Sequence, residues 1–381
     1  MTIILAIICV AIWAYLLAAR GQFWRGPVRD APVRRRPQHW PSVAAVIPAR
    51  NEAECIGESV QSLLRQDYPA SFRIIVVDDD SSDGTADVAR AAAAKTGRAL
   101  TVLAGKGPPA GWTGKLWALK QGIAAAEAVR PDYLLLTDAD IVHAPDSLTS
   151  LVAQSLSGRF VLTSLMAKLR CKSLAERLHV PAFIYFFQML YPFSWVCRTD
   201  RRTAAAAGGC MLVRADALES AGGIASIRNA LIDDCSLAAK LKTVGPIWLG
   251  LTERVRSIRP YPTFADVRQM ISRSAYAQLR YSPLRLAGTI AGMALTFLAA
   301  PLLGLFASGV AQYLGLAVWL AMAASFVPTL RFYRLSPFWG LALPAIAILY
   351  LLYTLDSAYR HWRRRGGQWK GRVHVNAASL Q

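Results

Sequence analysis

The sequence predicts an α/β domain with a Rossmann-like, mostly parallel sheet, attached to transmembrane helices at both ends of the chain. Between residues 43 and 137, short apolar stretches with strand character alternate with stretches of helical periodicity. Continuous apolar strands separated by helices are typical of a parallel sheet that is covered on both faces. Residues 2–19 and 286–330 contain no charged side chain, and about 20 such residues are enough to span a bilayer.

The alternation opens with an expected strand at residues 43–47 and an expected helix at 52–66, whose apolar residues recur at helical spacing. The elements expected after these are a strand at 73–77, a helix at 85–95, a strand at 100–103, a helix at 115–129 and a strand at 133–137. Ligands of such sheets bind beyond the carboxyl ends of the strands. Polar residues that directly follow a strand are therefore the first candidates for a site.

The first apolar run is predicted to be an uncleaved membrane anchor, residues 1–20. No positive charge precedes the run and a series of arginines follows it, which is the opposite of the order in a signal peptide. These arginines are Arg20, Arg25, Arg29, Arg34, Arg35 and Arg36. By the positive-inside rule they place the following segment, and with it the soluble domain, in the cytoplasm.

Composition divides the remaining chain into four parts. A Pro/Arg-rich linker at 21–41, which we expect not to pack, precedes a soluble domain at 42–281. A membrane block at 284–356 holds two or three helices, and a basic tail occupies 357–381. Three spans would leave the arginines at 363–365 outside, against the positive-inside rule, so the number of spans is left open.

The chain carries a formal net charge of +19, with 43 Lys and Arg against 24 Asp and Glu. Nucleic-acid-binding proteins are one class with such a charge. Many of these arginines, however, flank apolar segments, where they bind anionic headgroups and fix the orientation of the helices. We therefore expect a bilayer as partner and no nucleic acid. The six cysteines show no metal-ligand spacing and are expected to be reduced thiols.

A first acidic cluster, Asp78 to Asp80, directly follows the strand at 73–77. Three adjacent aspartates repel one another and exceed what capping the next helix requires. We expect Asp78 or Asp79 to contact a ligand, whereas Ser82 and Asp83 are expected to cap the helix.

A second cluster, Asp138-Ala139-Asp140, follows the strand at 133–137. Two carboxylates at this spacing suit a hard divalent cation such as Mg²⁺ or Mn²⁺, which keeps open positions for phosphate oxygens. Such an ion stabilises the negative charge that develops on a diphosphate leaving group. The sequence therefore predicts a divalent-metal site at Asp138 and Asp140.

Two further stretches place candidate residues at expected helix starts. Residues Gly111–Lys115 offer backbone amides and an ammonium to a phosphate, without the spacing of a P-loop. An ordinary loop with a solvated lysine is the alternative. Asp233 and Asp234 begin a helical pattern, where an ionised carboxylate is favoured and suits a general base. The alternative is that these two carboxylates only stabilise the start of the helix by interacting with its dipole.

The last stretch of interest, Arg268–Tyr281, precedes the membrane block and includes Gln278 and Arg280. Its basic and aromatic groups suit either a diphosphate or an anchor at the membrane interface. His143 and His179 have no partners at ligand spacing, so we expect both to be structural.

In their order along the chain, four motifs resemble those of family 2 glycosyltransferases with a GT-A fold. They are Pro48-Ala49-Arg50-Asn51-Glu52, Val77-Asp78-Asp79-Asp80-Ser81-Ser82-Asp83, Asp138-Ala139-Asp140 and Asp233-Asp234. The resemblance covers residues 42–281. Within the family the chain looks like the hopanoid-biosynthesis-associated (hopene-associated) branch, related to ceramide glucosyltransferases. That similarity comes from Gly111–Lys115, Leu231–Asp234, Gln278–Tyr281 and Trp369–Arg372.

The resemblance implies a nucleotide-sugar donor, a lipid acceptor and a bacterial inner membrane. It also implies three sets of site residues. Donor contacts would come from Pro48, Arg50, Glu52, Asp78, Asp79, Lys115 and Asp138, metal ligands from Asp140 and Asp138, and acceptor or diphosphate contacts from Asp233, Gln278 and Arg280. Asp234 would be the catalytic base of an inverting single displacement. The segment Gln278–Tyr281 departs from the family's (Q/R)xxRW motif, because its spacing is shorter and it has Tyr in place of Trp.

Three hypotheses follow. The first is an inverting transferase that moves a sugar to a lipid hydroxyl, with a hopanoid or a related lipid as acceptor. The second is a polyprenyl-phosphate glycosyltransferase, whose acceptor phosphate needs no base. The third is a non-catalytic membrane scaffold, which leaves the acidic clusters unexplained.

Overall fold

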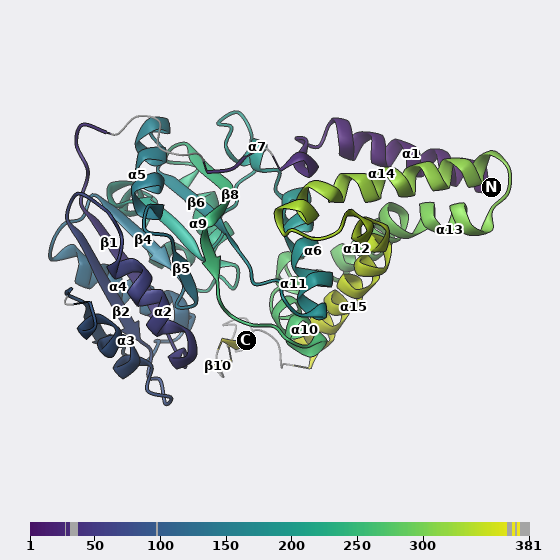
Figure 1. The fold of residues 1–381 in the computed structure, drawn as a ribbon. Helices are drawn as coiled ribbons and strands as arrows, with labels where there is room; N and C mark the ends of the chain where they lie inside the picture. The colour runs from purple at the N-terminus through teal and green to yellow at the C-terminus, as the bar shows by residue number, and fades with distance from the viewer. Residues whose placement is uncertain (27, 31–36, 97, 364–367, 370–371, 374–381) are drawn as a thin grey trace. The chain divides into compact units, whose positions relative to one another are not determined.

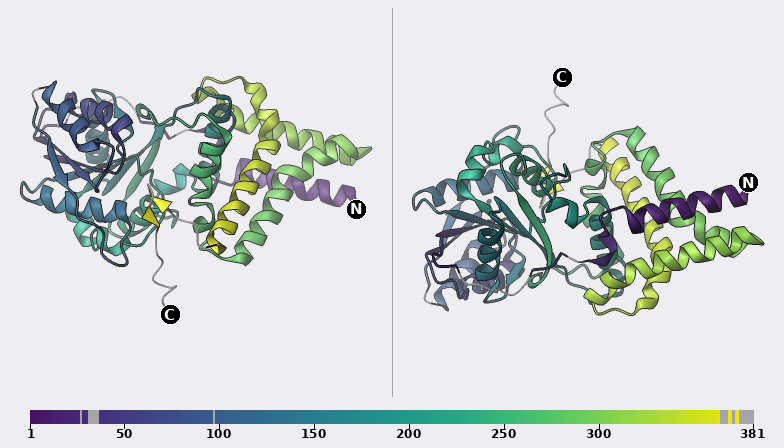
Figure 2. Two further views of the ribbon diagram at one scale, coloured as in Figure 1. Left: turned by 90° about the horizontal axis from the view of Figure 1, so that it is seen from below. Right: turned by 90° about the horizontal axis from the view of Figure 1, so that it is seen from above.

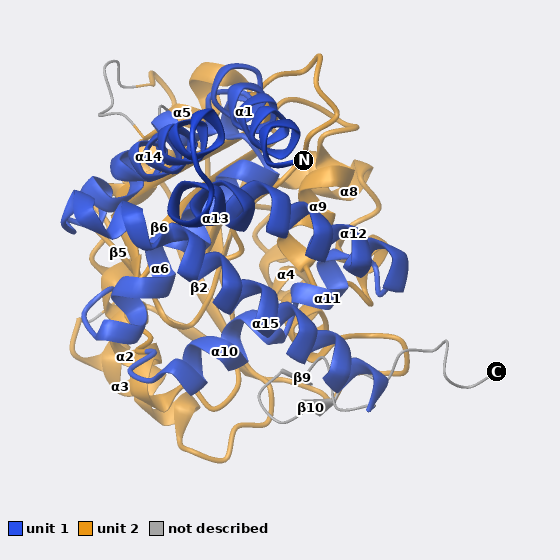
Figure 3. Ribbon diagram, turned by 90° about the vertical axis from the view of Figure 1, so that its right-hand side faces the viewer, with its two compact units in different colours: residues 1–27, 171–194, 261–367 blue, residues 28–170, 195–260, 368–381 orange. Residues whose placement is uncertain are grey.

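The computed structural model describes residues 1–26, 28–30, 37–96, 98–363, 368–369 and 372–373 (Figure 1). The chain forms two compact units, coloured separately in Figure 3. We call residues 28–170, 195–260 and 368–381 the sheet unit, and residues 1–27, 171–194 and 261–367 the helical unit. The range 42–281 is thus not one contact unit, because 171–194 and 261–281 pack with the apolar helices. Several residues singled out above lie outside the described residues, namely Arg34–Arg36, Arg364, Arg365, Lys370 and Gly371.

The sheet unit is built on one eight-stranded sheet with the order β3-β2-β1-β4-β7-β6-β8-β5. The strands are β1 (Val43–Ala49), β2 (Phe72–Asp78), β3 (Thr101–Ala104), β4 (Tyr133–Thr137), β5 (Ile141–His143), β6 (Leu162–Lys168), β7 (Cys210–Arg214) and β8 (Ile247–Ser257). Neighbours from β3 to β4 are parallel, as are β6 and β8. Strand β7 runs antiparallel to both β4 and β6, and β5 runs antiparallel to β8. The predicted α/β class with a mostly parallel sheet is confirmed.

Helices cover both faces of the sheet because alternate residues of each strand point to opposite sides. They are α2 (Ala53–Leu64), α3 (Thr85–Ala94), α4 (Gly114–Glu127), α5 (Ser147–Gly158), α8 (Ala215–Ser220) and α9 (Asp233–Leu241). Val43, Ala45 and Ile47 of β1 share one hydrophobic core with residues of α2, α3 and α5. Helix α4 covers the other face, where a β-carbon added at Gly122 would lie 2.4 Å from the Val46 side chain. Only glycine allows α4 to approach the sheet this closely.

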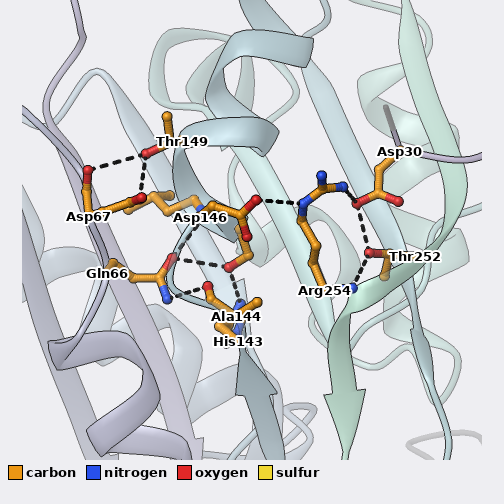
Figure 4. Close-up of polar contacts among 11 residues, drawn as sticks. Asp30, Gln66, Asp67, His143, Ala144, Asp146, Thr149, Thr252 and Arg254 are labelled. Atoms are coloured by element: carbon orange, nitrogen blue, oxygen red, sulfur yellow. Dashed lines mark hydrogen bonds and ion pairs between the residues drawn. The ribbon is translucent and has the colours of Figure 1, made fainter. Parts of the chain in front are cut away.

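The linker packs more than expected. Arg29 forms a parallel bridge with Leu251 of β8, and the Asp30 amide donates to the Leu251 carbonyl at 3.0 Å. The side chain of Asp30 also pairs with Arg254, which in turn reaches Asp146 at the start of α5 (Figure 4). The expectation that the linker does not pack is therefore wrong for these residues, because this part of β8 offers its backbone groups for pairing.

The helical unit contains three helices that are long and apolar enough to cross a membrane, at Pro283–Phe306, Val310–Phe332 and Pro337–Trp362. A shorter apolar helix, α1, runs from Thr2 to Ala18. The unit's elements are α1, η1 (Phe23–Arg25), α6 (Leu174–Leu190), α10 (Phe264–Ser272), α11 (Ala275–Gln278), α12 (Pro283–Met293), the π-helical η3 (Ala294–Leu298), α13 (Ala299–Phe306), α14 (Val310–Phe332), η4 (Pro337–Ala342) and α15 (Leu343–Trp362). Apolar helices thus occur at both ends of the chain, as predicted.

The helices of this unit pack through small residues and a few polar contacts. Helices α13 and α14 approach so closely that a β-carbon added at Gly315 would lie 2.6 Å from the Gly304 amide. Small residues allow this kind of approach between helices in membranes. Helix α1 lies beside both (Figure 2), and the Trp13 indole donates to the Thr296 carbonyl in η3 at 2.7 Å. Their outer surface remains apolar, with exposed side chains such as Ile4 and Leu302.

Candidate active site

Most of the candidate site residues predicted from sequence lie at one edge of the sheet. Strands β1, β2 and β4 are parallel, so their carboxyl ends meet at this edge, and the pairing of β7 brings its amino end there as well. Strand β8 runs in the same direction as β4 and ends at the same edge. The first acidic segment begins with Asp78, the last residue of β2, and the second, Asp138–Asp140, directly follows β4. This is the edge at which open α/β sheets bind ligands.

Lys115 lies among four carboxylates, Asp138, Asp140, Asp233 and Asp234, which we call the acidic cluster. Its ammonium lies 2.9 Å from Oδ1 of Asp138 and 3.0 Å from Oδ2 of Asp233. The hydroxyl of Thr113 accepts a hydrogen bond from the Leu116 amide and caps the start of α4, which fixes the turn that carries the lysine. A single ammonium therefore joins two carboxylates that are distant in the sequence.

Asp234 lies beside this group. Its Oδ2 accepts a hydrogen bond from the Gly208 amide at 3.0 Å. A β-carbon added at Gly208 would lie 3.5 Å from both Oδ2 of Asp234 and the ammonium of Lys115, so both groups border the same glycine. Burial, together with the charge of Asp233, raises the pKa of Asp234 to about 6, although Lys115 opposes the shift. At neutral pH most of this carboxylate is ionised and can accept a proton.

The cluster is richer in negative than in positive charge. Burial raises the pKa of Asp138; Lys115 opposes this shift, and the nearby charges of Asp140 and Asp233 add to it. Burial is the main cause of the raised pKa, but the negative charges of Asp140 and Asp233 beside Asp138 would also be stabilised by an additional cation. The cluster is therefore suited to a cationic ligand.

Asp140 is held from the other side by the end of β8. Its Oδ2 accepts hydrogen bonds from the Ser257 hydroxyl at 2.8 Å and from Nε of Arg259 at 3.2 Å. The same guanidinium forms an ion pair with Glu52, which follows β1. The sequence analysis missed Ser257 and Arg259, and the only available signal was their position just after a long apolar strand.

The donor set of Asp138 and Asp140 fits a divalent cation. Both supply hard carboxylate oxygens, and among the described residues no side chain or amide donates to Oδ2 of Asp138 or to Oδ1 of Asp140. In the described part of the chain, no three His, Cys, Asp or Glu side chains form a closed ligand set. Mg²⁺ commonly takes only one or two protein carboxylates and completes its coordination with water and substrate phosphates.

Hydrogen bonds join the segment at the end of β2 to the segment after β1. The Arg50 guanidinium donates to the main-chain carbonyls of Asp79 and Asp80, and the Asn51 amide donates to the Ser81 hydroxyl at 2.9 Å. Asp79 is fully buried, while Oδ1 of Asp78 accepts the Ser81 amide. These contacts fix both segments at the edge that carries the cluster. Donor binding by these residues, and by the buried Pro48 within β1, stays a prediction.

Two other expected site residues lie in the helical unit. The Gln278 side chain donates to the Tyr191 hydroxyl, and Arg280 adopts a left-handed backbone conformation with φ of 52°. Neither belongs to the unit that carries the acidic cluster, and their contact with acceptor or diphosphate stays a prediction.

Neither histidine singled out earlier lies with the acidic residues. His143 is buried against the Thr137 hydroxyl, and burial lowers its pKa to about 4, so it is neutral. His179 contacts the Ala175 carbonyl and the Tyr353 hydroxyl within the helical unit. These contacts agree with the structural roles that we expected. All six cysteines are free.

A cavity of about 580 Å³ lies at the opposite edge of the sheet. It is lined by residues near the amino ends of β2 and β3, among them Tyr68, Phe72, Arg98 and Thr101. It has no acidic lining residue, and we assign it no part in the site.

Comparison with known proteins identifies the family. Residues 41–276 match the family described as glycosyltransferase like family 2. The chain is 36% identical over 115 residues to the uncharacterized glycosyltransferase YaiP of Escherichia coli, and 34% identical over 114 residues to the 4,4'-diaponeurosporenoate glycosyltransferase of Staphylococcus aureus. Each alignment covers 30% of this chain, but only 26% and 28% of these relatives.

Among solved structures, the fold is similar to that of the mannosyltransferase PcManGT from Pyrobaculum calidifontis, solved in complex with GDP-Man and Mn²⁺. The TM-score is 0.52 at 20% identity, and the similarity covers 92% of this chain and 99% of that one. Because the family match extends over more than half of the chain, this protein belongs to glycosyltransferase family 2, and its fold is of the GT-A type.

Proposed function

We propose that the enzyme transfers a sugar from a nucleotide-sugar donor to a hydroxyl group of a membrane lipid, with inversion and with a divalent metal ion. The acceptor that we propose to test first is a hopanoid or a related polycyclic lipid. The catalytic unit would work at the cytoplasmic face of a bacterial inner membrane. The observation that carries the proposal is the convergence of Asp138, Lys115, Asp233 and Asp234 at the ligand-binding edge of a GT-A sheet.

In this proposal Asp78 and Asp79 bind the nucleoside, and Asp138 and Asp140 hold Mg²⁺ or Mn²⁺. The bound ion would stabilise the negative charge on the departing diphosphate. Lys115 holds Asp138 and Asp233 at a fixed separation and adds a permanent positive charge near the reacting groups.

Asp234 is the proposed general base. The Gly208 amide and the amide of Cys235 hold its two oxygens, at 3.0 and 2.7 Å. A carboxylate with a pKa of about 6 is ionised at neutral pH, and it is more basic than an ordinary aspartate. It would take the proton of the acceptor hydroxyl as that oxygen attacks the anomeric carbon. A single displacement of this kind inverts the anomeric configuration.

Two observations support the donor and acceptor classes. The same fold accommodates GDP-Man and Mn²⁺ in the Pyrobaculum enzyme, and the Staphylococcus relative is named for a lipid-like substrate, diaponeurosporenoate. The helical unit of this chain has three helices that are apolar enough to cross a bilayer, which suits an acceptor dissolved in the membrane.

The test is to incubate the full-length protein in nanodiscs with several nucleotide sugars and a bacterial lipid extract. Mass spectrometry would then identify the lipid that gains a sugar. We expect a Mn²⁺- or Mg²⁺-dependent product with the unchanged protein and with Asp87→Ala, which alters an exposed aspartate on α3. Asp140→Ala should yield none while remaining folded. Full metal-dependent activity in Asp140→Ala would reject the metal-site assignment.

A further inference from the structure

We propose that Arg259 is a positioning residue that, together with Glu52, presents one oxygen of Asp140 to the divalent ion. This inference rests on the metal site of the proposed function and assigns a role to two residues outside the ligand set. It also gives Glu52, which sequence analysis expected to contact the donor, a different task.

The contacts on Asp140 are all made to one of its oxygens. Oδ2 accepts from Ser257 and from Nε of Arg259, whereas no side chain or amide among the described residues donates to Oδ1. The main chain is held as well, because the Ile258 amide donates to the Asp140 carbonyl at 3.0 Å. The carboxylate therefore has a fixed orientation, in which Oδ1 is left for a ligand.

Glu52 determines how Arg259 binds. A guanidinium facing a lone carboxylate commonly forms two parallel hydrogen bonds and occupies both oxygens. Here Nη2 of Arg259 pairs with Glu52, and Nε pairs with Oδ2 of Asp140. Glu52 is 7% exposed and its amide donates to the Thr85 hydroxyl at 2.8 Å, so its position is well fixed. Glu52 thereby keeps Oδ1 of Asp140 available.

A matched arrangement on β8 provides a control. Arg254 also bridges two carboxylates, with Nη1 2.7 Å from Asp30 and Nε 3.0 Å from Asp146 (Figure 4). Neither of these aspartates belongs to the acidic cluster. The two arginine bridges differ chiefly in whether one of their carboxylates is a proposed metal ligand.

The decisive variant is Glu52→Gln/Arg259→Gln, which removes one negative and one positive charge and so preserves the net charge of the site. Mn²⁺ binding to the full-length protein, without donor, would be measured from the electron paramagnetic resonance signal of free Mn²⁺. We expect the affinity to fall about 10- to 100-fold, as is common when partners of metal ligands are lost. The control double variant Asp30→Asn/Arg254→Gln should bind Mn²⁺ as the unchanged protein does.

Ser257→Ala keeps the experiment informative if the double variant fails to fold, because it removes one donor from Oδ2 without altering charge. We expect a loss of affinity of about threefold to tenfold, at or below the lower end of that range. Unaltered Mn²⁺ affinity in folded Ser257→Ala and Glu52→Gln/Arg259→Gln would overturn the positioning role while leaving the metal site standing. If the unchanged protein transfers sugar without binding Mn²⁺ or Mg²⁺, both this inference and the metal assignment fail.

Discussion

The two units of the molecule differ in the polar groups that they bring together in their interiors. In the sheet unit, Lys115 and Arg259 lie between carboxylates at one edge of the sheet. In the helical unit, the buried Glu176 carboxylate accepts main-chain amides, and several other buried polar contacts join neutral groups. The Tyr185 hydroxyl contacts Ser325 at 2.6 Å, and the Tyr353 hydroxyl contacts His179 at 3.1 Å.

This difference indicates where the chemistry is located. Withdrawing charges from water is costly, and a buried ion pair often contributes less to stability than apolar packing would. Perturbed, partly buried charges that gather in one place are therefore more typical of function than of structure. Neutral hydrogen bonds between helices contribute modestly to stability and carry no such implication.

The largest expected effect comes from Asp234→Asn. The amide keeps the shape of the side chain but cannot accept the acceptor's proton, so we expect kcat/KM to fall roughly 10²- to 10⁴-fold. Asp87→Asn on the surface of α3 is the control and should retain activity. Substantial turnover in Asp234→Asn would instead favour a phosphate acceptor, such as a polyprenyl phosphate, which is already a nucleophile.

A smaller effect is expected on the pH profile. Since Asp234 must be ionised to act, kcat/KM should rise with pH through a midpoint near 6. Lys115 favours the ionised form, so Lys115→Met should move the midpoint upward by about one pH unit. The measurement is kcat/KM from pH 5 to 9, on the order of the range over which such groups titrate.

Lys120→Met is the control for that profile, because Lys120 is exposed on the same helix and lies over the Trp112 ring. Its midpoint should match that of the unchanged enzyme. An identical midpoint in Lys115→Met would contradict the electrostatic link between the lysine and Asp234.

The smallest effect is expected in the helical unit, from Tyr185→Phe. Ser325 also donates to the Met322 carbonyl at 2.7 Å, so the substitution removes one hydrogen bond without leaving a donor unpaired. We expect a loss of about 1 kcal/mol in the free energy of unfolding and unchanged kcat/KM. Thermal unfolding in detergent and activity in nanodiscs would measure the two. A large loss of activity in the folded variant would contradict the assignment of the chemistry to the sheet unit alone.

The sequence predicted those helices and strands that follow from the local pattern of apolar and polar residues. All seven elements expected between residues 43 and 137 occur, with ends displaced by only a few residues. The acidic segments were found because strands with continuous apolar character end visibly in sequence. Their shared edge then followed from parallel pairing.

The remainder depends on pairings between distant segments. The placement of β7 between β4 and β6 follows no local pattern, and 171–194 joins the helical unit only through packing. Arg259 reaches Asp140 across 119 positions of sequence. No motif places a guanidinium beside a particular carboxylate at that separation. Expectations for Gln278 and Arg280 came from a motif that this chain carries only in altered form.

The hydrogen bond from Trp13 to Thr296 has a consequence for the first helix. The π turn of η3 departs from regular α-helical hydrogen bonding, and in hydrocarbon a backbone carbonyl without a donor costs several kcal/mol. The indole of α1 donates to a carbonyl of this turn. The N-terminal helix thus takes part in the hydrogen bonding between the helices of this unit. An apolar helix of equal length without a tryptophan at this position would not donate this hydrogen bond.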